Sequence, residues 1–186
     1  SSGALMNQAD DDGWTPLNAA SHKGHLDIVK FLISSGALMN KANDGAYTPL
    51  NSASQEGHLD IVKVLISSGA SINQADINGD TPLMTASSYG HFEIVMTLVH
   101  SHAALHSIND DHNTAVSLAL ENGHSEIAKF LEQAIKWQRR RPLLLMRLWH
   151  DHKDNKAHRP TSLGRFLIDK NDQEGQDIKR LIVSYL

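Results

Sequence analysis

Apolar residues along this chain fall into short helical groups that alternate with polar turns. Leu17 and Ala20 give one apolar face to a short helix that begins at Pro16 and ends at Gly24. Thr15 stands where a helix N-cap is expected, and proline in the first helical position loses no hydrogen bond. Glycine adopts the left-handed conformation that ends a helix at little cost. The pattern therefore predicts a capped helix of about two turns.

A second helix follows and is more strongly apolar. Gly36 ends it, and its apolar residues are Ile28, Val29, Leu32 and Ile33. Asn43-Asp44-Gly45 then predicts a tight turn before the next threonine and proline. A single turn and helix pair cannot bury its own apolar face, so neighbouring units must stack against one another.

The same landmarks return every 33 residues. Thr-Pro begins at residues 15, 48 and 81, with Thr114-Ala115 next; Gly-His begins at residues 24, 57, 90 and 123. Residues 1–7 match residues 34–40 letter for letter, so we expect the chain to start inside a truncated repeat. The expected units are the tail of that repeat (1–9), four repeats (10–42, 43–75, 76–108 and 109–138) and a C-terminal extension (139–186).

Charge separates these two parts of the chain. Residues 1–136 hold 6 Lys+Arg against 15 Asp+Glu, a net of −9, whereas the remaining residues hold 11 against 6, a net of +5. An acidic array is a poor ligand for nucleic acid. The chain has no cysteine, which excludes disulfides, thiolate zinc sites and cysteine nucleophiles and favours an intracellular, cytoplasmic location, with the nucleus left open. The longest apolar run, residues 143–146, is too short to span a membrane.

The four repeats resemble the ankyrin-repeat family. Its pattern is roughly D-x-x-G-x-T-P-L-H-x-A-x-x-x-G-H, and this chain has DDDGWTPLNAASHKGH, NDGAYTPLNSASQEGH, DINGDTPLMTASSYGH and NDDHNTAVSLALENGH. The resemblance covers residues 1–138. It implies an all-α solenoid in which each repeat has a turn or β-hairpin tip and a helix-turn-helix, here followed by a helical extension of no recognised family.

Several positions depart from the family pattern. The histidine of T-P-L-H is replaced by Asn18, Asn51, Met84 and Ser117, so the hydrogen bonds that this histidine makes between repeats do not carry over. Ala46 and His112 occupy the place of the turn glycine, and His102 occupies the helix-ending place of Gly36 and Gly69. These three are predicted left-handed residues, which is uncommon without glycine. The fourth repeat has lost the most landmarks, as terminal capping repeats do.

The family resemblance implies a concave face, made of the turn tips and first helices, that binds another protein. The family's variable positions correspond here to Asp11, Asp12, Trp14, His22, Lys23, Asp44, Gly45, Tyr47, Gln55, Glu56, Ile77, Asn78, Asp80, Ser88, Tyr89, Asp110, Asp111, Asn113, Glu121 and Asn122. Trp14, Tyr47 and Tyr89 are the expected anchors, since exposed Trp and Tyr are enriched at interfaces, and the acidic residues favour a basic partner. Phe31, Phe92 and Phe130 fall on framework positions. The alternative is that these aromatic and acidic residues serve only the turns themselves.

The sequence gives no basis for a metal, a cofactor or catalysis. Each second helix starts with one of His25, His58, His91 and His124, and the other histidines have no zinc-ligand spacing. Residues 76–80 resemble part of a calcium loop but lack its glutamate. No hydrolase, zinc-protease, phosphate-loop or dinucleotide motif is present in the sequence. We expect a monomeric, non-catalytic protein.

The extension leaves several interpretations open. Arg139, Arg140 and Arg141 either close the last helix or form a nuclear-localisation signal, and the apolar residues 143–149 are suited to cover the last repeat. Two short amphipathic helices are predicted within residues 161–186. They form a cap, dock an effector or mask the concave face. The expected function is an adaptor, scaffold or targeting module; the alternative is a substrate receptor or regulatory subunit whose tail docks an effector such as a ubiquitin-ligase component.

Overall fold

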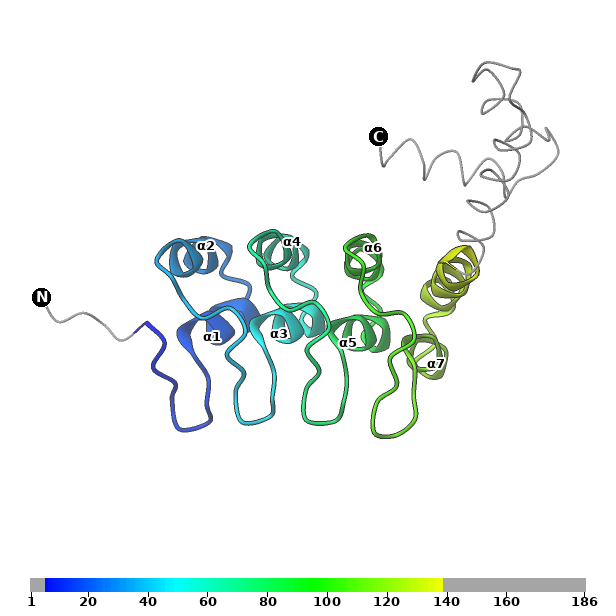
Figure 1. Cartoon of the computed structure of the whole chain (residues 1–186), viewed down its shortest axis with the longest axis horizontal. Coiled ribbons are helices and arrows are strands. Elements are labelled where there is room, and N and C mark those ends of the chain that lie inside the picture. The colour runs from blue at the N-terminus through cyan, green and yellow to red at the C-terminus, as the bar shows by residue number, and fades with distance from the viewer. Residues whose placement is uncertain (1–5, 139–186) are drawn as a thin grey trace, which may run out of the picture. The chain divides into compact units, whose positions relative to one another are not determined.

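Helix pairs stand side by side along the chain, and each pair is preceded by a loop that projects to one side (Figure 1). A computed structural model describes residues 6–138, and within them there are helices and turns but no strand. Contacts divide the chain into two units, Ser1–Arg139 and Arg140–Leu186. The helices are α1 (Pro16–His22), α2 (Leu26–Ser34), α3 (Pro49–Gln55), α4 (Leu59–Ser67), α5 (Pro82–Ser88), α6 (Phe92–His100), α7 (Ala115–Glu121) and a last helix over residues 125–138.

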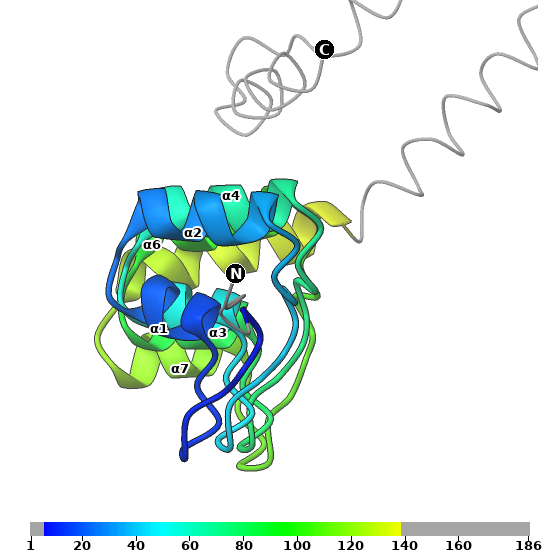
Figure 2. The same cartoon turned by 90° about the vertical axis from the view of Figure 1, so that its left-hand side faces the viewer.

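The all-α repeat prediction is confirmed, and the helix starts follow from local chemistry. Thr15, Thr48 and Thr81 each accept a hydrogen bond from the backbone N–H three residues on, with proline directly after. Thr114 caps α7 in the same way without a proline. Of the two forms expected for each tip, the structure has the tight turn; we call these four projecting turns fingers (residues 10–14, 43–47, 76–80 and 109–113). Figure 2 shows them projecting together, away from the helices.

The recurring Gly-His pairs interlock adjacent repeats. The ring of His58 donates from Nε2 to the carbonyl oxygen of His22, at 3.0 Å, and it lies directly over Gly24. A Cβ at Gly24 would stand 2.7 Å from His58 Cε1, and Gly24 has φ +77°. The same bond recurs from His91 to Gln55, at 2.8 Å, and the next pair repeats it. Glycine is therefore required here by both its conformation and its neighbour.

Two of the family's missing histidines are replaced in function by asparagine. Asn18 is buried, and its Nδ2 donates to the carbonyl oxygen of Tyr47 in the next repeat, at 2.7 Å. Asn51 reaches Asp80 in the same way, at 3.4 Å. The bond between repeats is therefore kept in the first two repeats. Met84 has no N–H to donate, and its sulfur instead accepts from the backbone of Thr81.

The three predicted left-handed residues are confirmed. Ala46, His102 and His112 have φ of +58°, +65° and +63°. Phe92 and Phe130 pack edge to face with ring centroids 5.5 Å apart, as framework residues should. Phe31 is 67% exposed although it occupies the Phe130 position, because no described segment packs against that side of α2. The predictions for Arg139, Arg140 and Arg141, for residues 143–149 and for helices within 161–186 lie outside the described residues.

Candidate functional site

Each finger is held by the side chain of its first residue, which is Asp or Asn. The Oδ1 atom of that residue accepts a hydrogen bond from the backbone N–H four residues later. The pairs are Asp10 with Trp14 at 2.8 Å, Asn43 with Tyr47 at 2.9 Å, Asp76 with Asp80 at 3.0 Å and Asn109 with Asn113 at 2.7 Å. The later residue of each pair is a predicted contact position. The hydrogen bond holds its backbone and therefore fixes the point from which its side chain projects.

The finger tips are also bonded to one another. Backbone N–H groups of Asp44, Ile77 and Asp110 donate to a carbonyl oxygen of the preceding finger, at 3.2, 3.1 and 3.0 Å. The four tips therefore form one continuous row. We use the term concave face for this row together with the accessible side of the first helices (α1, α3, α5 and α7).

None of the predicted contact side chains is buried. The exposed ones are Asp11, Asp12, Lys23, Asp44, Glu56, Ile77, Asn78, Tyr89, Asp110, Asp111, Glu121 and Asn122. The half-buried ones are Trp14, His22, Tyr47, Gln55, Asp80, Ser88 and Asn113. Among the three aromatic anchors only Tyr89, at 56% exposure, is open to solvent over most of its side chain. The ring of Trp14 lies against His22 of its own repeat, and Tyr47 lies against Asp76 of the next repeat.

At one end of the concave face, a contact joins the first and second repeats. The rings of Trp14 and His22 lie 5.2 Å apart, centroid to centroid. His22 Nδ1 lies 3.5 Å from Glu56 Oε1, and Gln55 Nε2 also donates to that oxygen, at 3.2 Å. These groups are partly exposed, so the contact between His22 and Glu56 contributes little stability and remains available to a partner.

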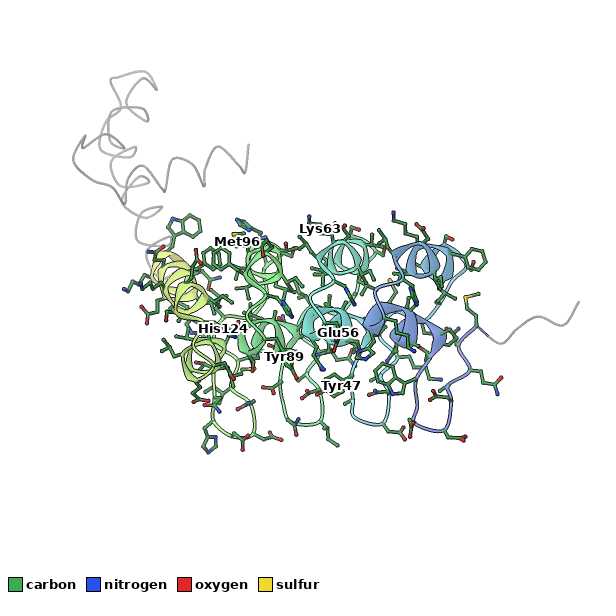
Figure 3. The ribbon with its side chains drawn as sticks, turned by 180° about the vertical axis from the view of Figure 1, so that it is seen from behind. Tyr47, Glu56, Lys63, Tyr89, Met96 and His124 are labelled. Atoms are coloured by element: carbon green, nitrogen blue, oxygen red, sulfur yellow. The ribbon has the colours of Figure 1, made fainter. Side chains whose placement is uncertain are left out.

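In the middle of the concave face, Tyr47 lies among acidic groups of the third repeat. Figure 3 shows Tyr47, Glu56 and Tyr89 on the side of the fingers and first helices, away from Lys63 and Met96 on the second helices. Burial raises the pKa of Tyr47 to about 12, with further contributions from Asp76, its hydrogen-bond partner, and from the nearby Tyr89 and Asp80. The phenol therefore stays protonated and donates to the buried Asp76 carboxylate.

The surroundings of Asp80 disfavour the charged form of its carboxyl group. Burial raises its pKa above the ordinary aspartate value, and Asp76, Asp111 and Asp110 raise it further, against one lowering contact from Asn109. That contact is a hydrogen bond of 2.8 Å from Asn109 Nδ2 to Asp80 Oδ1. The second, third and fourth fingers contain no lysine or arginine. The middle of the concave face is therefore acidic, and no lysine or arginine of these three fingers balances its carboxylates.

Sequence reasoning missed the organising role of Asp76 and Asn109. Asp76 was part of the rejected calcium loop, yet it is buried and holds both its own finger and Tyr47. Asn109 is buried too and ties Asp80 to the fourth repeat. The available signal was the recurrence of Asp or Asn at residues 10, 43, 76 and 109, always four positions before a predicted contact.

Two other kinds of site are absent from residues 6–138. In that part of the chain no three His, Asp or Glu side chains group closely enough to hold a metal ion. No helix of the described part is long and apolar enough to cross a membrane.

The repeats match a known protein family. A family model described as ankyrin repeats (3 copies) matches residues 2–76 and again residues 71–140. No curated protein matched the chain. The matched segments together cover well over half of the 186 residues and include every finger and helix pair described above. The chain therefore belongs to the ankyrin-repeat family.

Proposed function

We propose that this chain is a non-catalytic recognition module that binds another protein through its concave face, as an adaptor, scaffold or targeting unit. Ankyrin repeats are in general protein–protein interaction modules, and repeat arrays of this kind use extended concave surfaces for binding. The observation that carries the proposal is a set of three aromatic side chains that are not buried: Trp14 and Tyr47 end two fingers that are bonded to each other, and Tyr89 follows the end of α5. Tyr and Trp are the usual anchors of protein interfaces.

Charge supports a basic partner. The concave face holds Asp or Glu at eight of the predicted contact positions, against a single lysine, Lys23. Complementary charge raises the rate of association and selects the partner, and like charge disfavours nucleic acid. We also propose that the protein needs no cofactor and that it acts as a monomer.

The opposite charge of the C-terminal extension favours a second candidate function. Residues 137–186 carry a net of +5 against −9 for residues 1–136. In this alternative the protein is a substrate receptor or regulatory subunit, in which the repeats select a target and the extension docks an effector.

Affinity capture from extracts of the source cells, read by mass spectrometry, tests both. The baits are the intact chain, the concave-face variant Trp14→Ala/Tyr47→Ala/Tyr89→Ala, and the chain ending at Trp149. A matched control replaces three exposed residues of the second helices: Lys30→Ala, Lys63→Ala and Glu93→Ala. A partner lost only by the concave-face variant supports the proposal. A partner lost only by the truncated chain supports the alternative, and one retained by every folded bait contradicts the concave face.

A further inference from the structure

Neighbouring fingers meet at three junctions, and the middle junction differs from the other two. At each junction a backbone N–H of one finger donates to a carbonyl oxygen of the finger before it. The bonded pairs are Asp44 with Asp12, Ile77 with Gly45 and Asp110 with Asn78, at 3.2, 3.1 and 3.0 Å. Both residues of each outer junction have a polar side chain, whereas Gly45 and Ile77 have none. Among these three junctions, the one between the second and third fingers is therefore the apolar one.

The ring of Tyr47 adds further apolar surface at this place. A Cβ placed on Gly45 would stand 3.1 Å from Cδ2 of Tyr47, so the ring lies directly beside the glycine. The side chain of Ile77 is 65% exposed. Gly45 lacks the positive φ of Gly13 and Gly79 in the neighbouring fingers, so its conformation does not require glycine. We call Gly45, Tyr47 and Ile77 the apolar junction.

The backbone of the apolar junction is held in place before any ligand arrives. The backbone N–H of Tyr47 donates to Oδ1 of Asn43, at 2.9 Å. The bond from Ile77 to Gly45 joins the second finger to the third, and the bond from Asp110 joins the third finger to the fourth. A ligand that contacts the apolar junction therefore loses little free energy in ordering these loops.

Carboxylates stand on both sides of the apolar junction. Asp12 and Asp44 form the junction before it, and Asp110 belongs to the junction after it; all three are exposed. Within residues 6–138 no hydrogen bond or ion pair engages any of these three carboxylates. Their charge is therefore available to cations of a ligand.

We propose that the apolar junction binds one apolar side chain of the partner protein, carried on an extended segment that has a basic residue on each side of it. This inference rests on the proposed function and adds the chemistry of the segment that is recognised. The apolar side chain packs on Ile77 and on the ring of Tyr47, which removes apolar surface of both proteins from water. The basic residues pair with the carboxylates of the outer junctions. The segment is extended because it has to reach both of those junctions.

Selection of peptides on the intact chain tests the proposal directly. A display library of random nine-residue peptides is selected on the immobilised protein at low salt, where charge attraction is least screened. We expect an apolar residue at one fixed position, with lysine or arginine on both sides of it. The affinity of the consensus peptide is then measured by fluorescence anisotropy, and replacing its apolar residue by serine should weaken binding.

Variants of the protein locate the bound apolar side chain. Ile77→Ala removes the exposed apolar group and should weaken binding of the consensus peptide about tenfold. Gly45→Ala places a methyl group beside the Tyr47 ring without backbone strain and should weaken binding by a smaller factor. Ile108→Ala is the matched control, because Ile108 is 62% exposed but is not a predicted contact position, and it should leave the affinity unchanged. Circular dichroism confirms that each variant is folded.

A second set of variants tests the basic residues of the segment. Asp44→Asn/Asp110→Asn removes one charge on each side of the apolar junction and should weaken binding at low salt, with a smaller effect at high salt. Glu126→Gln/Glu132→Gln makes the same two chemical changes at exposed positions of the last helix and should leave the affinity unchanged. Equal affinities of these two variants at low salt would overturn the assignment of the basic residues.

Other results separate this proposal from the proposed function. A library that yields no peptide, selected peptides without a fixed apolar position, or an unchanged affinity for Ile77→Ala or Gly45→Ala would each overturn the role of the apolar junction. If selected peptides that ignore Ile77→Ala still lose binding to the Trp14→Ala/Tyr47→Ala/Tyr89→Ala variant, the concave face remains the recognition surface. If they bind that folded variant as well as the intact chain, the concave-face proposal fails too.

Discussion

Equivalent positions in this array differ sharply according to whether another repeat lies against them. Ile61 of the second repeat is 2% exposed, whereas Ile28, its equivalent in the first, is 50% exposed. On the opposite side of the repeat, Ser54 is 0% exposed, whereas Leu120 of the fourth repeat is 55% exposed. The residue types are not the cause, because serine is the buried one of the second pair. Burial here belongs to the interface between repeats, as expected for a stacked solenoid.

The binding surface follows the same rule. Several contacts that shape the concave face cross from one repeat to the next: Tyr47 bonds to Asp76, His22 lies against Glu56, and Asn109 bonds to Asp80. Whether a neighbouring repeat covers a residue should therefore decide how much that residue contributes to stability and how accessible it is to a partner. Substitutions at equivalent positions of different repeats can test this.

The largest difference is expected for a matched pair of isoleucines. Ile61→Ala removes a fully buried side chain and should lower the free energy of unfolding by about 2–5 kcal/mol. Ile28→Ala removes a half-exposed one, and about 1 kcal/mol is expected. Urea unfolding followed by circular dichroism measures both. Equal losses would mean that α2 is covered as fully as α4 in solution.

A matched pair of glycines isolates the interlock between repeats. Gly57 and Gly123 have nearly the same backbone, with φ of +78° and +80°, but a Cβ would meet His91 Cε1 at 2.7 Å only at Gly57. Alanine costs about 1–2 kcal/mol at either position through backbone strain. Gly57→Ala also displaces His91 from Gln55 and should cost about 1 kcal/mol more. Unfolding midpoints that shift equally for both variants would show that the histidine ring adapts freely.

How much the sequence predicts depends on the reach of each interaction. Thr48 and Pro49 specify a helix start through local bonds, and Ala46 was predicted to be left-handed because it occupies the place of the family's turn glycine. The bond from Asn18 to Tyr47 spans 29 residues and was not predicted, because asparagine stood where the family pattern has histidine. The exposure of Ile28 could not be predicted either. Ile28 and Ile61 are the same residue type at equivalent positions, and the residue type does not indicate whether a neighbouring repeat covers it.

The bond between repeats made by Asn18 gives a third test. Asn18→Ala removes two buried hydrogen bonds, one to the carbonyl oxygen of Tyr47, which keeps its bond from the backbone N–H of Asn43, and one from the Thr15 hydroxyl. The loss should be about 1–3 kcal/mol. Ser117 is the equivalent residue of the fourth repeat, and its side chain bonds within its own repeat, to Thr114 and Asn113. Ser117→Ala should cost about 0.5–1.5 kcal/mol. Urea unfolding of the two variants, with Ser125→Ala as an exposed control, measures the difference; a larger loss for Ser117→Ala would contradict the role given to Asn18.

The smallest effect is expected at Asp80, and its sign is opposite. Burial, followed by the neighbouring Asp76, Asp111 and Asp110, raises the pKa of Asp80, so the folded state holds its proton more tightly than the unfolded chain does. Folded-state stability from this group is therefore lost as the pH rises above the ordinary value of 3.8. Asp80→Asn removes that loss, so the variant should be more stable than the natural chain at neutral pH, and this advantage should shrink below pH 3.8.

Urea midpoints of Asp80→Asn and the natural chain, compared at both pH values, check this sign. Glu126→Gln, an exposed change of the same kind on the last helix, is the control and should show no such pH-dependent difference. A destabilised Asp80→Asn at neutral pH would mean that the carboxylate is already balanced by a cation of the chain itself. A stabilised variant that also loses a partner captured by the intact chain would instead show that the protein keeps this carboxylate for recognition, although the carboxylate lowers the stability of the fold.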